Sequence, residues 1–269
     1  MTKLLPFRWY GGKYSHLNWI LPLLPDERQY VEPYGGSGAV LLNREPAKVE
    51  TFNDIDSDIT NFFKVLRENP DEFIEKIALT PYSREEYEEA VEKMEDDSLS
   101  KMEQARLFFV RAGQVTNGLA QSATPGRWSY CITMSRRDMS GNISSYYGKL
   151  DKLDKIAERL RRVQIESIPA LDCIQRYDDE NTLFYCDPPY PSSSRGDPNS
   201  YNYEMSDEEH RELAEVLKQC DGKVAISSYE CDIMDELYGD WRKSKEKEKK
   251  THTGKANRQE CIWMNYKKE

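Results

Sequence analysis

The sequence lacks the features that would place it in a membrane or a secretory pathway. No apolar run in its 269 residues approaches the roughly 20 residues that a membrane-spanning helix needs. Residues 1–8 also lack the apolar stretch of a signal peptide, so a cytoplasmic protein is expected. Apolar residues make up 38% of the chain and aromatic residues 11%, which is enough for a packed core and excludes a disordered protein.

Histidine is scarce and cysteine is scattered. The chain has three histidines, and its six cysteines form no C-x-x-C pair. A zinc site would therefore find few ligands, and the sequence predicts no metal. In a reducing compartment the cysteines should be free thiols with a packing role.

The net charge of −10 would argue against a nucleic-acid partner if it were spread evenly. The charge is instead segregated along the chain. Residues 85–97 are heavily acidic, residues 127–162 are net basic, and residues 242–258 are dense in lysine. Because a phosphate backbone is bound by a local basic surface, the negative total does not exclude DNA.

Apolar runs near both ends of the chain predict the strands of an α/β sheet. Strands at 30–31 and 49–52 flank a glycine-rich turn and an apolar helix at 39–44, a βαβ pattern with parallel strands. The continuous apolar run at 182–186 is typical of a strand buried on both faces. Further along, the patterns predict strands at 224–226 and 261–266, and a helix that begins with a Ser206–Glu209 capping box and ends at Gln219.

The middle of the chain has a different character. It is predicted to form helices at 62–77, 84–94 and 101–113, followed by a polar loop at 117–147. An amphipathic helix at 151–162 comes next, and then the strands resume. We therefore predict an α/β domain made of residues 1–60 and 150–269, interrupted by a mostly helical insertion of residues 61–149.

The turn Pro33-Tyr34-Gly35-Gly36-Ser37-Gly38 has the composition of a ligand-binding loop. Its glycines let backbone N–H groups come close to a ligand. Asp54 follows the next predicted strand, where a carboxylate can accept hydrogen bonds from ribose hydroxyls. Glycine is also common in ordinary turns, so it is the loop and the acid together that favour a nucleoside cofactor.

A second motif, Asp187-Pro188-Pro189-Tyr190, directly follows the strand predicted at 182–186. α/β folds bind ligands at this edge of a parallel sheet, although a strand that ends in a proline turn is the simpler interpretation. An amine conjugated to an aromatic ring, such as that of adenine, is a poor nucleophile because its lone pair is delocalised. Asp187 and the backbone carbonyl of Pro188 can accept hydrogen bonds from the N–H groups of such an amine. Tyr190 offers an aromatic face for stacking, and the prolines fix the turn.

Five motifs, in this order, resemble those of the Dam-type family of DNA adenine methylases. Phe7–Lys13 (FRWYGGK) resembles the family's W-A-G-G-K motif, and Val31–Gly38 (VEPYGGSG) resembles E-P-F-x-G-S-G. Asn53–Asp56 (NDID) resembles N-D-I-N, Asp187–Tyr190 is D-P-P-Y, and Ser227–Tyr229 (SSY) resembles S-N-Y.

The resemblance implies a Rossmann-like methyltransferase sheet that uses S-adenosylmethionine (AdoMet) to methylate the N-6 amine of adenine in double-stranded DNA. The motif order is that of the alpha group, in which the insertion is the target-recognition domain. The catalytic residues would be Asp187, Pro188 and Tyr190. The cofactor contacts would be Trp9, Lys13, Glu32, Pro33, Gly35, Ser37, Gly38, Asp54, Ile55, Ile168 and Asp187.

The resemblance fades within the insertion, where side-chain chemistry must identify the residues that contact DNA. Asparagine suits adenine edges, and arginine suits guanine edges or phosphates. Trp128 can wedge into the base stack where the target adenine flips out, or it can anchor its own loop. The candidates are Asn117, Arg127, Trp128, Arg136 and Arg137, each of which can equally be a solvated loop residue.

Other interpretations stay open from the sequence alone. The chain could methylate cytosine N-4, an RNA base or a glutamine, although Asp187 before Pro-Pro-Tyr favours adenine. It could also be a DNA-binding protein with a dead site, or a nucleotide enzyme of another class. Cys186 is expected to be a buried strand residue, because amine methylation needs no covalent enzyme intermediate. The recognition sequence and a partner restriction endonuclease also stay open, whereas no membrane or obligatory protein partner is expected.

Overall fold

The computed structural model describes residues 3–194, 204–247 and 259–267. The chain divides into two compact units. Unit 1 comprises Met1–Tyr14, Gly36–Asn43 and Asp56–Ser167, and unit 2 comprises Ser15–Gly35, Arg44–Ile55 and Ile168–Glu269. The predicted insertion at 61–149 lies wholly within unit 1. Most of the lysine-dense stretch, residues 248–258, lies outside the described residues.

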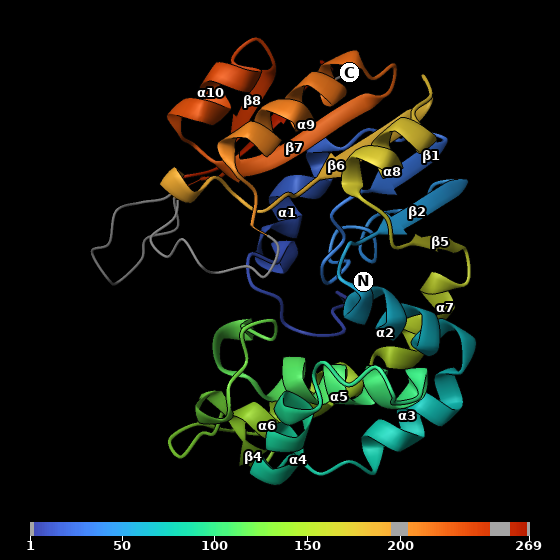
Figure 1. Ribbon diagram of the computed structural model, residues 1–269, viewed down its shortest axis with the longest axis vertical. Coiled ribbons are helices and arrows are strands. Elements are labelled where there is room, and N and C mark those ends of the chain that lie inside the picture. Colours follow the sequence, from blue (N-terminus) through green and yellow to red (C-terminus); the bar gives the residue numbers. More distant parts are fainter. Residues whose placement is uncertain (1–2, 195–203, 248–258, 268–269) are drawn as a thin grey trace. The chain divides into compact units, whose positions relative to one another are not determined.

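Unit 2 is built on an α/β sheet (Figure 1). Its strands lie side by side in the order β2-β1-β6-β7-β9-β8. Strands β2, β1, β6 and β7 are parallel neighbours, and β9 is antiparallel to both β7 and β8. The bounds are Gln29–Glu32 (β1), Val49–Asn53 (β2), Val163–Glu166 (β5), Thr182–Cys186 (β6), Lys223–Tyr229 (β7), Arg242–Lys245 (β8) and Glu260–Met264 (β9).

This topology confirms the predicted Rossmann-like α/β fold. Strands form at all of the places that the apolar runs indicated, and the parallel pairing expected of the first two strands is present. The order of the strands reverses between β1 and β6, and ligands bind at such a reversal in open α/β sheets.

Three helices of unit 2 cover one face of its sheet: α8 (Ala170–Tyr177), α9 (Asp207–Gln219) and α10 (Asp232–Tyr238) (Figure 1). The core between them includes Ile174, Leu217 and Met234 from the helices, and Phe184 and Trp263 from the strands. Burial of this apolar surface is the main stabilising contribution of the layer. The predicted capping box at the start of α9 is confirmed.

Unit 1 is mostly helical. A cluster of phenylalanines forms its core, in which the rings of Phe62 and Phe109 stack at 6.0 Å and Phe7 meets Phe108 edge to face at 5.0 Å. Its helices are α2 (Ser57–Glu68), α3 (Pro70–Ala78), α4 (Arg84–Glu92), α5 (Lys101–Gln114), α6 (Gly141–Leu150) and α7 (Leu153–Leu160). The short elements among the described residues are 3-10 helices at Lys13–His16, Leu21–Leu23, Thr116–Gly118, Pro125–Arg127 and Ser192–Ser194, helix α1 (Leu17–Ile20), and strands β3 (Ser135–Arg136) and β4 (Met139–Ser140).

The single helix predicted at 62–77 is wrong, because α2 and α3 are separate helices. The break lies at Asn69, whose backbone angles, φ −135° and ψ 56°, are not helical. Pro70 causes it, since the proline ring disfavours a helical conformation in the residue before it. Pro70 then occupies the first turn of α3, where its missing N–H costs nothing.

The helix predicted at 39–44 is also wrong, because these residues form consecutive turns. Two carbonyl groups that a regular helix would use accept bonds from side chains instead. The Asn43 side chain donates to the Ala39 carbonyl at 2.7 Å, and Arg159 donates to the Leu41 carbonyl at 2.9 Å. One of these contacts is local and the other is tertiary, and both compete with the backbone bonds of a regular helix.

The other predicted helices, at 84–94, 101–113 and 151–162, are confirmed to within two residues at each end. Within the described ranges, no helix has both the length and the apolar character required to cross a membrane.

Candidate functional site

Four parallel strands of unit 2 bring distant motifs to one edge of the sheet. Strands β2, β1 and β6 are followed directly by Asp54, Pro33 and Asp187, and β7 ends at Tyr229. Because the strands are parallel, all four chain segments leave the sheet at the same edge. Strands β1 and β6 are neighbours, so the turn after Glu32 and the turn that begins at Asp187 leave the sheet side by side.

Asn53, the last residue of β2, ties two of these segments together. Its side-chain amide donates to the carbonyls of Pro33 at 2.8 Å and Ile168 at 3.0 Å, and its amide oxygen accepts from the Ile168 N–H at 3.0 Å. The Asn53 carbonyl accepts from the Gly35 N–H at 2.8 Å. Sequence reasoning placed Asn53 in a motif without giving it this role; an asparagine at a strand end before an acid was the available signal.

The glycine at position 35 is required by its neighbour in the next strand. A Cβ atom added there would lie 2.2 Å from the ring of Phe52, far inside any real contact. Phe52 is itself buried at 1% exposure, so its ring has no room to move away. The close approach of the turn to β2 therefore depends on Gly35.

Two carboxylates at this edge differ in their surroundings. Glu32 is buried and accepts the Tyr30 hydroxyl at 2.6 Å, and burial followed by the charge of Glu32 raises the pKa of Tyr30. Asp54 is half-buried, and the next residue, Ile55, is 44% exposed. A partly open carboxylate beside an exposed apolar side chain suits a nucleoside, which has both ribose hydroxyls and a flat ring. The residues present therefore fit the predicted cofactor.

Asp187 is held by a serine that sequence reasoning did not single out. The Ser227 hydroxyl on β7 donates to Oδ1 of Asp187 at 2.9 Å. Ser227 in turn accepts from the Tyr185 hydroxyl at 3.3 Å, and Tyr185 is buried on β6. One oxygen of the carboxylate is thus oriented by a chain of hydrogen bonds that begins in the sheet. The SSY motif includes Ser227, but the motif alone does not show that Ser227 contacts Asp187.

Tyr190 is 4% exposed and tightly packed. Its hydroxyl donates to the Glu260 carboxylate on β9, and its ring meets that of Tyr229 edge to face at 4.9 Å. Burial, followed by the charges of Glu260 and Asp187, raises the pKa of Tyr190 well above its usual value. Pro188 is buried as well. The neighbouring Cys186 lies in the sheet core, and burial raises the pKa of its thiol, which disfavours a nucleophilic thiolate.

The remaining cofactor candidates belong to unit 1: Trp9, Lys13, Ser37 and Gly38. Lys13 is buried, and its Nζ donates to the Gly11 carbonyl at 2.7 Å. The half-buried Trp9 lies against Gly36, whose φ of 52° is in the left-handed region and where a Cβ would be 3.1 Å from the indole ring. Ser37 and Gly38 are buried in the turn that follows.

The candidate DNA contacts differ in how far contacts within the protein hold their side chains in place. Arg127 donates to the carbonyl of Ser122 at 3.0 Å and to its hydroxyl at 2.8 Å. Trp128 donates from Nε1 to Gln114 at 3.0 Å, and the Arg84 guanidinium lies 4.8 Å over its ring. These contacts favour an anchoring role for Trp128.

Asn117, Arg136 and Arg137 are exposed. Arg136 is the last residue of strand β3, which forms a hairpin with β4. The two turn residues of this hairpin, Arg137 and Asp138, have φ of 53° and 59°. Two positive φ values in succession are characteristic of a type I′ turn, for which Asn-Gly would be the unstrained choice. The hairpin therefore presents its arginines at an exposed tip, at some cost in backbone strain.

Lys149 on α6 is a buried cation that sequence reasoning missed. It is 8% exposed, and it lies one helical turn after Ser145, whose hydroxyl accepts from Arg8 at 3.3 Å. Burial, followed by the charge of Arg8, lowers the pKa of Lys149 to about 8. The folded protein thus releases this proton at a lower pH than the unfolded chain, whose lysine pKa is about 10.4.

This shift predicts that the free energy of unfolding rises with pH above about 8. In that window the unfolded state binds more protons than the folded state. The pKa shift of Lys149 therefore adds on the order of 2 kcal/mol to the free energy of unfolding by about pH 10. Urea unfolding across this range should show that increase in the wild type and not in Lys149→Met. Lys155→Met, at an exposed position on α7, is the matched control. Parallel pH profiles for the wild type and Lys149→Met would contradict the prediction.

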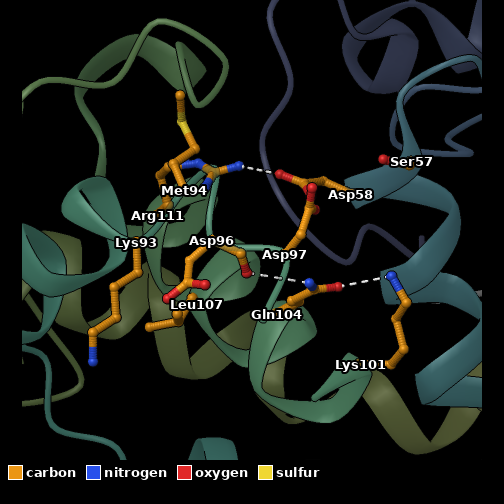
Figure 2. A pocket seen from close by; sticks show the side chains of 10 residues that line it. All are labelled: Ser57, Asp58, Lys93, Met94, Asp96, Asp97, Lys101, Gln104, Leu107 and Arg111. Atoms are coloured by element: carbon orange, nitrogen blue, oxygen red, sulfur yellow. Dashed lines mark hydrogen bonds and ion pairs between the residues drawn. The ribbon is translucent and has the colours of Figure 1, made fainter. Parts of the chain in front are cut away.

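Unit 1 also contains a small cavity (Figure 2). It has a volume of about 40 Å³ and is lined by residues of α2, of α5 and of the segment after α4. The Arg111 guanidinium pairs with Asp58 at 2.6 Å, and the Gln104 side chain donates to the Asp96 carbonyl at 3.4 Å. Dashed lines in Figure 2 mark both interactions. The cavity has room for water but not for a nucleoside, and none of the predicted site residues lines it.

Comparison with known proteins agrees with the family that the sequence motifs resemble. The family model for the D12 class N6 adenine-specific DNA methyltransferases matches residues 9–253. The type II methyltransferase M1.LlaDCHI of Lactococcus lactis subsp. cremoris is 27% identical, over 98% of this chain and 96% of the relative. The DNA adenine methylase of Escherichia coli K12 is 26% identical, over 86% of this chain and 82% of the relative.

Proposed function

Because this chain belongs to the D12 class N6 adenine-specific DNA methyltransferases, we propose that it uses AdoMet to methylate adenines at specific sites in double-stranded DNA. The observation that carries this proposal is the pairing of two motifs on neighbouring strands. The turn after β1 and the D-P-P-Y turn after β6 leave the same sheet edge, and Ser227 orients Asp187 there at 2.9 Å. A methyl donor and an acceptor amine need two such adjacent sites.

The proposed cofactor contacts in unit 2 are supported by its hydrogen bonds. Asn53 fixes the backbone at Pro33 and Ile168 relative to its own strand, which ends beside Asp54. We assign the ribose hydroxyls to Asp54 and the adenine ring of AdoMet to Ile55 and Ile168. Glu32, Pro33 and Gly35 would line the methionine part. Trp9, Lys13, Ser37 and Gly38 of unit 1 remain predictions from the family resemblance.

When bound, AdoMet supplies the methyl group. The residues of this chain prepare the acceptor: Asp187 accepts an N–H of the target amine through one carboxylate oxygen, while Ser227 holds the other. The Pro188 carbonyl accepts the second N–H, and together these acceptors draw the nitrogen lone pair away from the ring. Tyr190 holds the base, which is flipped out of the duplex because its amine is otherwise out of reach.

We further propose that residues 61–149 recognise the DNA sequence and that residues 1–60 and 150–269 form the catalytic domain. The Lactococcus relative is named a type II methyltransferase. A partner restriction endonuclease for this chain, and a cytoplasmic location, stay predictions.

The function is tested by expressing the chain in cells that lack adenine methylation and sequencing their DNA for N-6-methyladenine. Methylated adenine within one short motif is the expected result, with an Asp187→Ala strain as the blank. Methylation at cytosine N-4, or none at all in a folded and AdoMet-binding protein, would overturn the assignment.

Alanine variants of the exposed arginines test the recognition role. Replacing Arg136 or Arg137 should weaken binding to every sequence and lower the salt slope by about 1 each, because phosphates carry no sequence information. Replacing Asn117 or Arg127 should relax sequence choice at one position by about 1–3 kcal/mol. Methylation profiling on a randomised DNA pool at two salt concentrations separates these outcomes. If all four variants keep the wild-type motif and slope, another surface reads the DNA.

A further inference from the structure

The sheet of unit 2 carries polar side chains on the face opposite its covering helices. Side chains alternate along a strand, so Ser227 and Tyr229 on β7 share one face, while Ile226, which directly precedes Ser227, points into the core under the helices. Tyr229 is the register partner of Glu260 on β9, and cross-strand partners lie on the same face. Trp263, three residues after Glu260, belongs to the opposite, apolar core. Glu260 therefore stands beside Tyr229, on the face that also carries Ser227.

Both of these cross-strand partners, Glu260 and Tyr229, contact Tyr190. Glu260 accepts its hydroxyl, and Tyr229 packs against its ring at an interplanar angle of 81°. Tyr190 is 4% exposed and Glu260 7% exposed, so the contact is shielded from water. A buried carboxylate is costly unless hydrogen bonds compensate it, and a charge-assisted bond to a phenol is among the stronger ones. Seventy residues separate the partners, so no local pattern connects them.

We propose that Glu260 is a positioning residue for methyl transfer, which fixes the Tyr190 hydroxyl and with it the setting of the D-P-P-Y turn beside Asp187. The inference rests on the proposed function, in which this turn holds the target adenine. Tyr190 is the last residue of the turn, and Asp187 is the first. Ser227 and Glu260 thus hold the two ends of the motif from adjacent strands, so that its geometry is set before DNA binds.

The charge of Glu260 has a second consequence. A phenol that donates to a carboxylate has a more electron-rich ring than a free phenol. The target amine gains positive charge as it accepts a methyl group, and an electron-rich ring nearby stabilises that charge. Glu260 thus acts on the reaction only through Tyr190, which distinguishes it from a residue that merely stabilises the fold.

A double-mutant cycle tests this coupling. Glu260→Gln keeps an acceptor without the charge, Glu260→Ala removes both, and Tyr190→Phe removes the hydroxyl while keeping the ring. Glu230→Gln is the matched control, because Glu230 follows Tyr229 but pairs with Lys243 and Lys245 rather than with Tyr190. The single-turnover methylation rate is measured on DNA free of N-6-methyladenine, with the AdoMet Kd from calorimetry and the free energy of unfolding from urea titration.

We expect Glu260→Ala to slow methylation about tenfold or more, Glu260→Gln to slow it less, and the AdoMet Kd to stay within about twofold. The double variant Tyr190→Phe/Glu260→Gln should be no slower than Tyr190→Phe alone. Effects that multiply, or Glu260 variants that keep the wild-type rate, would overturn the proposal. If the wild type itself does not methylate adenine, the proposed function fails, whereas the cycle in unfolding free energy still reports whether the two residues are coupled.

Discussion

Replacement of Asp187 by alanine should abolish methyl transfer while leaving AdoMet binding nearly unchanged. Asp187 is the proposed acceptor for the target amine, and Ser227 holds its carboxylate in place at 2.9 Å. Removing an oriented acceptor of this kind costs on the order of a hundredfold or more in rate. The cofactor should stay bound, because most of its proposed contacts come from other segments. Single-turnover methylation and calorimetric AdoMet titration measure the two effects separately.

The control for Asp187 lies at the other end of the same strand. Asp179 is exposed and precedes β6, where it bonds to Asn181. Asp179→Ala therefore makes the same chemical change without reaching the site, and its rate should match that of the wild type. An Asp187→Ala rate within a few-fold of the wild type, in a protein that unfolds normally, would remove Asp187 from the chemistry.

Replacement of Asp54 by alanine should weaken AdoMet binding roughly tenfold to a hundredfold. The lost interaction is a charge-assisted hydrogen bond to ribose hydroxyls, worth about 1.5–3 kcal/mol. Asp54 follows directly after Asn53, which anchors two backbone segments, so the carboxylate is held in a defined place. Isothermal calorimetry with AdoMet measures the change, and methylation at saturating AdoMet should recover most of the wild-type rate.

Asp54→Asn supplies the graded comparison. It keeps an oxygen acceptor but not the charge, so its AdoMet Kd should fall between those of the wild type and Asp54→Ala. An unchanged Kd in both folded variants would show that Asp54 is not a cofactor contact.

Much of the fold follows from short-range patterns. The apolar runs at 49–52 and 182–186 form strands, and the Ser206–Glu209 spacing begins α9, because each signal lies within a few residues. The signal for the helix break at Asn69 is equally local, because it is the adjacent Pro70. The prediction of one helix at 62–77 followed the helical pattern on both sides and did not take this proline into account. The turns at 39–44 were not predictable in this way, because Arg159 supplies one of the bonds that replace the helix.

The sequence by itself determined the family and the positions of five strands of the sheet, and it supplied the proposed catalytic residues, because motifs and apolar runs are local properties of the chain. Only the tertiary structure decided what holds those residues. The bond from Asn53 to Ile168 spans 115 positions, that from Ser227 to Asp187 spans 40, and that from Tyr190 to Glu260 spans 70. Such contacts form only after the strands of the sheet bring distant segments to one edge, and the choice of partner then depends on register and burial rather than on sequence spacing.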